Sequence, residues 1–306
     1  LAIFSNFLRF TPKTPFIPDV IGNESGAPQI NTFIKYLLFN YSNMKFAILT
    51  DIHLGPEGHH KGVLRKMNKD VKMFLEDFVA EMNNNVKPKF VVVLGDLVED
   101  DNETNDKNNI DYIVKLLKKL ECPVYYVAGN HDLKNISENE LANLFNQKRL
   151  YYSFDSGSFH FIVLFSRVSE DRTIWIPDEQ KVWLKKDLNK TDKKTIVFVH
   201  HGLADQDVTG NPWFEGRPEN CLIANRKEIR NIFSKSNKVI ASFNSHLHWD
   251  KQDIHKNIPY FTIQSLTENE NDKGIASETH AVVGIEGNKV NVDIKGNYSK
   301  KFLHQS

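Results

Sequence analysis

The segment PVYYVAGNHDL, residues 123–133, joins an apolar run to three polar side chains. Residues 123–129 form a compact apolar stretch of strand length, which is typical of a buried strand. Asn130, His131 and Asp132 follow at once, and such side chains are costly to bury without partners. The segment is therefore either a turn that happens to be polar, since Gly and Asn are common in turns, or a strand end that delivers these side chains to a shared site.

Two earlier segments repeat this strand pattern, with helical spacing between them. Residues 45–50 (KFAILT) and 90–95 (FVVVLG) are apolar runs of strand length. Apolar residues at helical spacing predict helices over residues 61–84 and from Ile110 to Leu120. Strand, helix, strand, helix and strand, with nearly continuous apolar strands, predict parallel strands that are covered on both faces.

The second half of the chain is less regular but rich in strand patterns. Six further apolar runs predict strands at residues 159–165, 195–201, 239–245, 259–265, 280–286 and 289–295. Helices are predicted at 178–188 and 225–234. Gly287-Asn288 joins the last two strands as an antiparallel hairpin. The acidic, Asn-rich stretch 99–109 is interpreted as a solvated loop. These elements predict an α/β fold with mixed parallel and antiparallel strands.

Composition restricts the class of partner. Among 306 residues, Lys plus Arg and Asp plus Glu number 39 each, so no overall field favours nucleic acid or an anionic membrane. No apolar run approaches the roughly 20 residues that span a bilayer, so no transmembrane segment is expected. Cys122 and Cys221 have no metal-binding spacing and indicate reduced thiols in a cytoplasmic protein, with one disulfide as the alternative.

Regular organisation begins at Met44, directly before KFAILTDIHLG. Residues 1–43 mix short apolar pieces with prolines, and Arg9 and Pro12 interrupt the first piece too early for a signal peptide. We therefore predict an N-terminal extension at 1–43 and one domain at 44–306. The extension is a flexible segment, an artefact of reading upstream of the start, or a segment that packs on the outside of the domain.

Five predicted strands end in polar residues. Their ends are Asp51-Ile52-His53, Gly95-Asp96, Gly129-Asn130-His131-Asp132, His200-His201 and Ser245-His246-Leu247-His248. Each group alone has an ordinary interpretation as a cap, a turn or a core imidazole. In open α/β sheets, however, the carboxyl ends of the strands converge on one ligand crevice. A pair of metal cations would offset the cost of gathering these carboxylates and imidazoles there.

The motifs DIH, GDLVED, GNHD, VHHG and SHLH, in this order, resemble those of the calcineurin-like metallophosphoesterase superfamily, D-x-H, G-D, G-N-H-[D/E], H and G-H-x-H. The resemblance covers residues 45 to about 250, and the predicted strands extend it to about 295. It implies a double β-sheet sandwich flanked by helices. The chain is more similar to single-domain phosphodiesterases, such as the class III cyclic-nucleotide type, than to Ser/Thr protein phosphatases, because no Arg follows Gly95-Asp96.

The resemblance implies a site for two divalent or trivalent metal ions, with Mn, Fe and Zn as candidates. One ion would be held by Asp51, His53 and His248, the other by Asn130, His200 and His246, and Asp96 would bridge them. The adjacent His201 stays an alternative to His200, and Ser245 replaces the usual Gly of the last motif.

Two catalytic candidates lie outside this ligand set. His131 is expected to stabilise or protonate the leaving oxygen, and Asp132 is expected to orient the His131 ring. Trp213 and Phe214, in the loop after VHHG, either stack on a substrate base or anchor the loop.

The resulting hypothesis is a metal-dependent phosphoesterase. Two ions about 3.5–4 Å apart can share a hydroxide and clamp a phosphoryl group for in-line attack. The expected substrate is a small phosphodiester or a molecule of the nucleotide type. One alternative is a phosphomonoesterase acting on a metabolite or a phosphoprotein. Another is a non-catalytic scaffold, which is disfavoured because every ligand position is filled.

Overall fold

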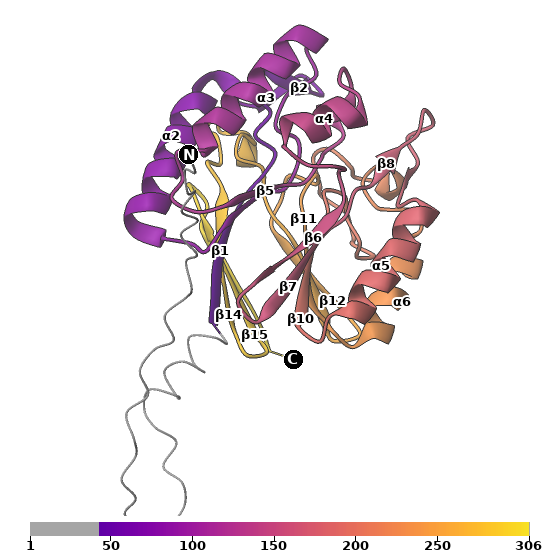
Figure 1. The fold of residues 1–306 in the computed structure, drawn as a ribbon. Coiled ribbons are helices and arrows are strands. Elements are labelled where there is room, and N and C mark those ends of the chain that lie inside the picture. Colours follow the sequence, from indigo (N-terminus) through magenta and orange to yellow (C-terminus); the bar gives the residue numbers. More distant parts are fainter. Residues whose placement is uncertain (1–42, 306) are drawn as a thin grey trace, which may run out of the picture.

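Two six-stranded β-sheets form the centre of the computed structural model, which describes residues 43–305 (Figure 1). The first sheet has the order β16 (Lys300–Gln305), β15 (Lys289–Lys295), β14 (His280–Glu286), β1 (Asn43–Leu49), β4 (Val91–Val93) and β5 (Val124–Tyr126). Strands β1, β4 and β5 are parallel, whereas β14, β15 and β16 form an antiparallel meander joined to β1. The predicted hairpin at Gly287-Asn288 is confirmed by the pairing of Glu286 with Lys289.

The second sheet is parallel at its centre and antiparallel at both edges. Its order is β12 (Lys251–His255), β13 (Ile258–Thr262), β11 (Val239–Asn244), β10 (Lys194–Phe198), β7 (Phe159–Val163) and β6 (Tyr152–Ser156). Strands β13, β11, β10 and β7 are parallel, and β12 and β6 pair antiparallel to their neighbours.

The two sheets pack face to face through alternate residues of their strands. In β1, Phe46 and Ile48 face the second sheet, whereas Ala47 and Leu49 face the helices. The ring of Phe46 lies 5.8 Å from that of Phe161 and 5.7 Å from that of Phe198, both edge to face. Such aromatic pairs add to the area buried between the layers.

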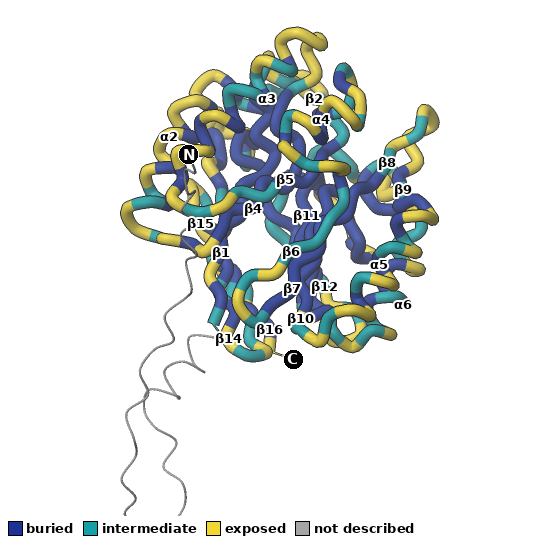
Figure 2. Tube along the Cα trace, viewed as in Figure 1, coloured by how far each residue is buried: buried dark blue, intermediate teal, exposed yellow. Residues whose placement is uncertain are grey.

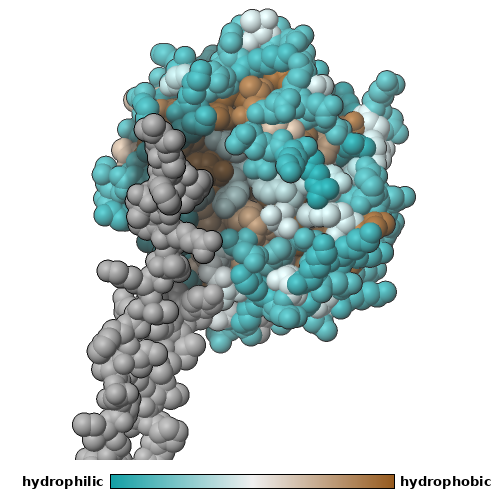
Figure 3. Space-filling model, in the orientation of Figure 1, coloured by the Kyte–Doolittle hydropathy of each residue, from teal (hydrophilic) through white to brown (hydrophobic). Residues whose placement is uncertain are grey.

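Four helices cover the outer faces of the sandwich (Figure 1). They are α2 (Val71–Glu81) and α3 (Glu103–Leu117) on the first sheet, and α5 (Asp178–Lys190) and α6 (Arg226–Ser236) on the second. Figure 2 shows buried strands beneath helices whose outer faces are exposed, and the face in Figure 3 is mainly hydrophilic. The predicted double sandwich with flanking helices is confirmed.

The predicted helix at 61–84 begins ten residues late. Residues Gly58–His60 (β2) and Val63–Lys66 (β3) instead form a small hairpin, and a 3₁₀ turn at Asn68–Asp70 precedes α2. Lys61 and Gly62, between the two strands, have φ values of 51° and 81°. Two successive positive φ angles match the right-handed twist of a tight hairpin, so this turn overrides the helical spacing of the apolar residues.

The predicted loop at 99–109 is wrong in its second half, because α3 begins at Glu103. The Asn102 side chain accepts a hydrogen bond from the Asn105 backbone N–H at 3.0 Å, which caps the helix. Glu103 and Asp106 lie in the first turn, where acidic side chains interact favourably with the helix dipole. The acidic character thus marks a helix start.

Several short helices and strands of the structure were not predicted from the sequence. They are α4 (Glu138–Leu144), the edge strands β6, β12 and β16, and the two-residue strands β8 (Arg167–Val168) and β9 (Ile174–Trp175), which project from the second sheet in Figure 1. A capping box formed by Ser137 and Glu140 begins α4.

The remaining sequence predictions have mixed outcomes. Among residues 43–305, no helix is both long and apolar enough to cross a bilayer. Cys122 and Cys221 are both free thiols. The predicted extension at 1–43 lies outside the described residues except for Asn43, which begins β1, so that domain boundary stays a prediction.

Candidate metal centre

The loops that follow β1, β4, β5, β10 and β11 meet at one end of the sandwich. Backbone hydrogen bonds from Asp51 N to Gly95 O (3.0 Å) and from His53 N to Asp96 O (3.1 Å) join the first two loops. A third, from Ser245 N to His200 O (2.9 Å), joins the last two. The structure therefore brings the five polar strand ends together.

Asp51, His53 and His248 form one buried cluster. The Nε2 atoms of the two histidines are 3.1 Å apart, and His248 Nε2 lies 3.4 Å from Asp51 Oδ1. His53 Nε2 is 3.9 Å from the same oxygen. One nitrogen or oxygen from each residue thus points toward a common centre, within 4.8 Å of the others.

A second cluster contains Asn130, His200 and His246, and Asp96 lies between the two clusters. His200 Nε2 is 3.2 Å from Asp96 Oδ2, and His53 Nε2 of the first cluster is 3.8 Å from the same oxygen. The rings of His200 and His246 are 5.1 Å apart. Asp96 is thus the carboxylate that faces both groups.

Three buried atoms of the predicted ligands lack a hydrogen bond of ordinary geometry within the described part of the chain. They are Asp51 Oδ1, Asn130 Oδ1 and His200 Nε2, although His248 faces Asp51 Oδ1 at 3.4 Å and Asp96 faces His200 Nε2 at 3.2 Å. Leaving a buried polar group unsatisfied costs about 1–3 kcal/mol, so a metal ion would satisfy these atoms better than their present neighbours do. Carboxylate, amide oxygen and imidazole nitrogen together suit divalent transition metals. The residues present therefore fit a metal centre.

Hydrogen-bond partners outside the two clusters fix the orientation of three histidine rings of the centre. His53 Nδ1 is 2.8 Å from Glu99 Oε2, His248 Nδ1 is 2.7 Å from Glu268 Oε2, and His200 Nδ1 donates to Leu94 O at 2.9 Å. A partner on Nδ1 leaves Nε2 free to bind a metal. Glu99 lies inside the GDLVED motif, whereas Glu268 carries no local sequence signal, and neither was predicted as a site residue.

The charges of the clusters are strongly coupled. Burial raises the pKa of Asp51, but His248 outweighs it, and the pKa falls to about 2. Burial lowers the pKa of His200, but Asp96 and Asp51 outweigh it, and the pKa rises to about 9. His248 rises to a pKa of about 9 through Asp51 in the same way. Burial instead lowers the pKa of His53 to about 4 and that of His246 to about 3. The metal-free site therefore holds ionised carboxylates beside protonated His200 and His248 and neutral His53 and His246.

Five residues of the centre have a left-handed backbone: Asp51, His53, Asp96, His246 and His248, with φ between 47° and 68°. Non-Gly residues adopt this region uncommonly, although Asp and His tolerate it better than most. Strained backbone conformations cluster at functional sites. Gly129 is needed for a different reason, because a Cβ there would lie 2.1 Å from Asp96 Oδ1.

The structure changes the interpretation of Asp132. The Nδ1 atom of His131 pairs with Asp100, so the expectation that Asp132 orients this ring is wrong. Asp132 is buried and accepts hydrogen bonds from the backbone N–H groups of Asp96 (3.0 Å), Leu97 (2.7 Å) and Gly129 (2.9 Å). The two residues begin a 3₁₀ turn at His131–Leu133, which sends their side chains in different directions.

The tandem histidines have different polar partners, although their rings are only 4.9 Å apart. His200 approaches Asp96, whereas His201 Nδ1 lies 2.7 Å from the Ser166 hydroxyl, which favours His200 as the ligand. Ser245, in place of the usual Gly, has no left-handed φ. Its hydroxyl donates to Leu94 O at 3.0 Å, beside the His200 contact with the same carbonyl, so the serine fits here.

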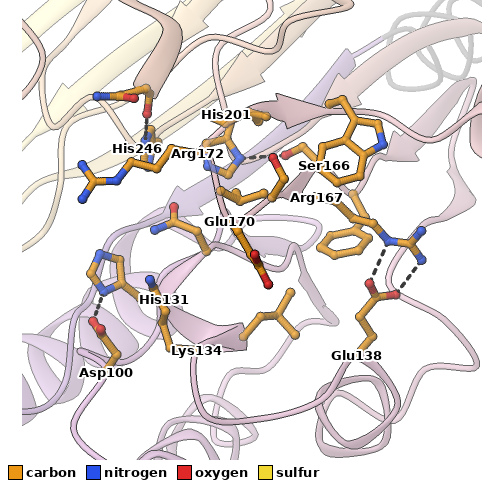
Figure 4. A pocket seen from close by; sticks show the side chains of 18 of the residues that line it. Asp100, His131, Lys134, Glu138, Ser166, Arg167, Glu170, Arg172, His201 and His246 are labelled. Carbon is orange, nitrogen blue, oxygen red and sulfur yellow. Dashed lines mark hydrogen bonds and ion pairs between the residues drawn. The ribbon is translucent and has the colours of Figure 1, made fainter. Parts of the chain in front are cut away.

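A cleft of about 750 Å³ opens over the centre. Asn130, His131, His201 and His246 line it, together with side chains of the β8–β9 hairpin (Figure 4). Trp213 forms part of the wall, and its indole N–H donates to Glu268 at 2.9 Å. This bond favours anchoring of the loop as the role of Trp213.

Comparisons with known proteins identify the family. Residues 44–250 match the sequence model of the calcineurin-like phosphoesterases, and the chain belongs to this family of metallophosphoesterases. It is 28% identical over 198 residues to a probable glycerophosphodiester phosphodiesterase of Arcobacter nitrofigilis, covering 61% of this chain and 67% of that protein. It is 24% identical over 254 residues to a probable cyclic nucleotide phosphodiesterase of a Pseudoalteromonas species, covering 78% and 87%.

Phosphatases are similar as well. A serine/threonine-protein phosphatase of Mus musculus is 29% identical over 196 residues, and the match covers 60% of this chain but only 61% of that protein. The crystal structure of a dimetal phosphatase from Danio rerio aligns with a TM-score of 0.71 and 15% identity, covering 86% of this chain and 98% of that one. At this identity the structural likeness shows the fold. The named relatives thus include both diesterases and phosphatases.

Proposed function

We propose that the chain is a two-metal hydrolase that cleaves a small phosphodiester or a nucleotide-type substrate. The observation that carries this proposal is the convergence of buried ligand atoms of Asp51, Asn130 and His200, none with a hydrogen bond of ordinary geometry, beneath an open cleft. Single atoms of this kind also occur in the core, as at Ser242 and Tyr260, but a group of them at the ends of several strands fits a metallophosphoesterase.

In this proposal Asp51, His53 and His248 hold one ion, Asn130, His200 and His246 hold the other, and Asp96 bridges the two. Mn, Fe and Zn all suit this mixture of imidazole and oxygen ligands. When bound, the two ions would lower the pKa of a water and neutralise charge on the phosphoryl group. Asn130 is a neutral ligand, so it limits the negative charge that an anionic substrate would meet.

His131 is the proposed partner of the leaving oxygen. Its side chain is 21% exposed and lines the cleft, outside both clusters. Asp100 holds Nδ1, and Nε2 lies 3.3 Å from the Lys66 ammonium. This arrangement places His131 and Lys66 together beside the centre, where a departing alkoxide needs a hydrogen bond or a proton. Asp132 acts through the backbone that carries Asp96.

The cleft favours a diester over a monoester. Pockets of about 300–1,000 Å³ accommodate whole small molecules, so about 750 Å³ leaves room for groups on both sides of a phosphate. The charged lining consists of Lys134, Arg167, Arg172 and Arg217 against Asp100, Glu138 and Glu170, and Arg167 pairs with Glu138 at 2.8 Å. This near balance suits a singly charged diester better than a doubly charged monoester. The free thiols fit our inference that the protein works in the cytoplasm.

The test is a substrate panel with the full-length protein reconstituted separately with Mn²⁺, Zn²⁺ and Fe²⁺. The panel contains bis(4-nitrophenyl) phosphate, 4-nitrophenyl phosphate, cyclic nucleotides and a glycerophosphodiester, and Asp96→Ala serves as the metal-deficient control. We expect kcat/KM at least about tenfold higher on diesters. Preference for the monoester would instead support a phosphatase, and no turnover with two ions bound would support a scaffold.

A further inference from the structure

His201 is a buried histidine for which neither the fold nor the proposed ligand set has a use. It follows His200 at the end of β10 and is only 1% exposed. Its Nδ1 atom lies 2.7 Å from the Ser166 hydroxyl, but its Nε2 atom is buried and has no hydrogen-bond partner within residues 43–305. The same signature marks the three ligand atoms of the centre, and His201 lines the cleft above that centre, unlike the unpartnered core atoms of Ser242 and Tyr260.

The His201 ring lies next to the rings of His200 and His246, two of the proposed metal ligands. The His201 ring is 4.3 Å from that of His246 and 4.9 Å from that of His200, and one nitrogen of each of the three rings lies within 4.8 Å of the others. His200 already takes the place beside Asp96. With Asp96, Asn130 and His246, the second ion would have four protein ligands, and a catalytic ion must keep positions open for water and substrate. His201 would then be close enough to contact a group bound at those positions.

The cleft above the metal centre also reaches His201. His201, His246 and Asn130 line it together, and Figure 4 shows His201 between His246 and Ser166. A substrate entering from the β8–β9 side reaches this ring as it reaches the centre. When the Ser166 hydroxyl donates to Nδ1, the ring carries its proton on Nε2 and becomes a hydrogen-bond donor.

We propose that His201 is a further substrate-binding residue, whose Nε2–H donates a hydrogen bond to a non-bridging oxygen of the phosphoryl group, and that Ser166 positions the ring. This assignment rests on the proposed function, since the ligand is a phosphoryl group at the same centre. It gives a role to the second histidine of the VHHG motif, which the ligand set leaves unused.

The matched variants are His201→Asn and His201→Gln. An asparagine amide reaches about as far as Nδ1 and can still meet Ser166, but it cannot replace Nε2, whereas a glutamine amide reaches about as far as Nε2. The first measurements are metal content and the Kd of inorganic phosphate, by calorimetry on the full-length, Mn²⁺-loaded protein. We expect two ions in each variant, a Kd for phosphate about tenfold weaker or more in His201→Asn, and partial recovery in His201→Gln. Ser166→Ala should weaken phosphate binding less than His201→Asn.

Kinetics with bis(4-nitrophenyl) phosphate provide the second readout. The kcat/KM of His201→Asn should fall by about 10- to 100-fold, and His201→Gln should recover part of it. Loss of one ion in His201→Asn would make His201 a ligand, and an unchanged Kd for phosphate would remove it from the binding site. Either result overturns the inference while leaving the proposed hydrolase in place. A wild-type protein that binds phosphate through His201 but hydrolyses no ester would overturn the proposed function alone.

Discussion

Asp132→Ala should destabilise the protein strongly, although Asp132 touches neither cleft nor ligand side chain. Its buried carboxylate accepts four backbone N–H groups at 2.7–3.3 Å, from Asp96, Leu97, Val98 and Gly129. These bonds fasten the loop after β4 to the loop after β5, and they hold Asp96 in its left-handed conformation.

The expected magnitude follows from those four donors. Alanine leaves each N–H buried without a partner, at about 1–3 kcal/mol per group. Relaxation of the loops and entry of water recover part of the sum, so we expect a loss of about 3–5 kcal/mol in the free energy of unfolding. Asp132→Asn keeps one acceptor oxygen but turns an NH₂ toward another donor, and it should cost about half as much.

The assay is urea unfolding of the metal-free, full-length chain at pH 8, followed by circular dichroism. Asp100→Ala is the matched control, because it removes a carboxylate of the same site that is 32% exposed and pairs with His131. An exposed pair contributes under about 1 kcal/mol. Equal effects of the two substitutions, or an Asp132→Ala effect below about 1 kcal/mol, would refute this account of Asp132.

Three further predictions concern the metal centre. Asp96→Ala should leave fewer than two ions per chain by elemental analysis, because Asp96 Oδ2 lies 3.2 Å from His200 Nε2 and 3.8 Å from His53 Nε2; two retained ions would contradict its bridging role. His131→Gln should keep both ions and lose on the order of 10²-fold in turnover on a diester with an alkyl leaving group, but much less on a nitrophenyl diester; equal losses would assign the ring to phosphate binding. The nearby carboxylates raise the pKa values of both His200 and His248 to about 9, so both rings must lose a proton before they bind a metal. Binding of Mn²⁺ at pH 7 should therefore release about two protons per chain, and the affinity for Mn²⁺ should increase from pH 6 to 9. Proton release is followed with a pH indicator in weak buffer, and Mn²⁺ binding without proton release would show that the two rings are already neutral.

The positions of the strand ends could be predicted because two signals coincide there. A run such as FVVVLG (90–95) has the length and composition of a buried strand, and Asp96 follows without any surface-type spacer. Parallel strands then bring such ends to one edge of the sheet. That reasoning holds for all five motifs. Backbone hydrogen bonds join them in two pairs, a bond from His131 N to Asp96 Oδ1 adds the third motif, and the contact of His248 with Asp51 joins the two pairs.

The supporting residues could not be predicted in this way. Glu268 lies in the loop after β13, and its sequence neighbours Thr267 and Asn269 are those of an ordinary polar loop. Its role depends on contacts with distant residues, because His248 lies 2.7 Å from one oxygen and Arg65 lies 3.1 Å from the other. Local spacing carries no information about such partners. For the same reason the prediction that Asp132 orients the His131 ring was wrong, since the residue that pairs with the ring, Asp100, comes from another loop.

The left-handed ligands show why those distant contacts matter. A left-handed conformation costs an ordinary residue roughly 1–2 kcal/mol and costs Asp and His less, so the five such residues of the centre together store on the order of a few kcal/mol of strain. A typical domain has a net stability of only about 5–15 kcal/mol. Loops in this state persist only when the surrounding structure determines them, and here the determining groups are the Asp132 carboxylate, the outer glutamates and the backbone bonds between the two sheets. The geometry of the ligands is therefore set by residues that bind neither metal nor substrate.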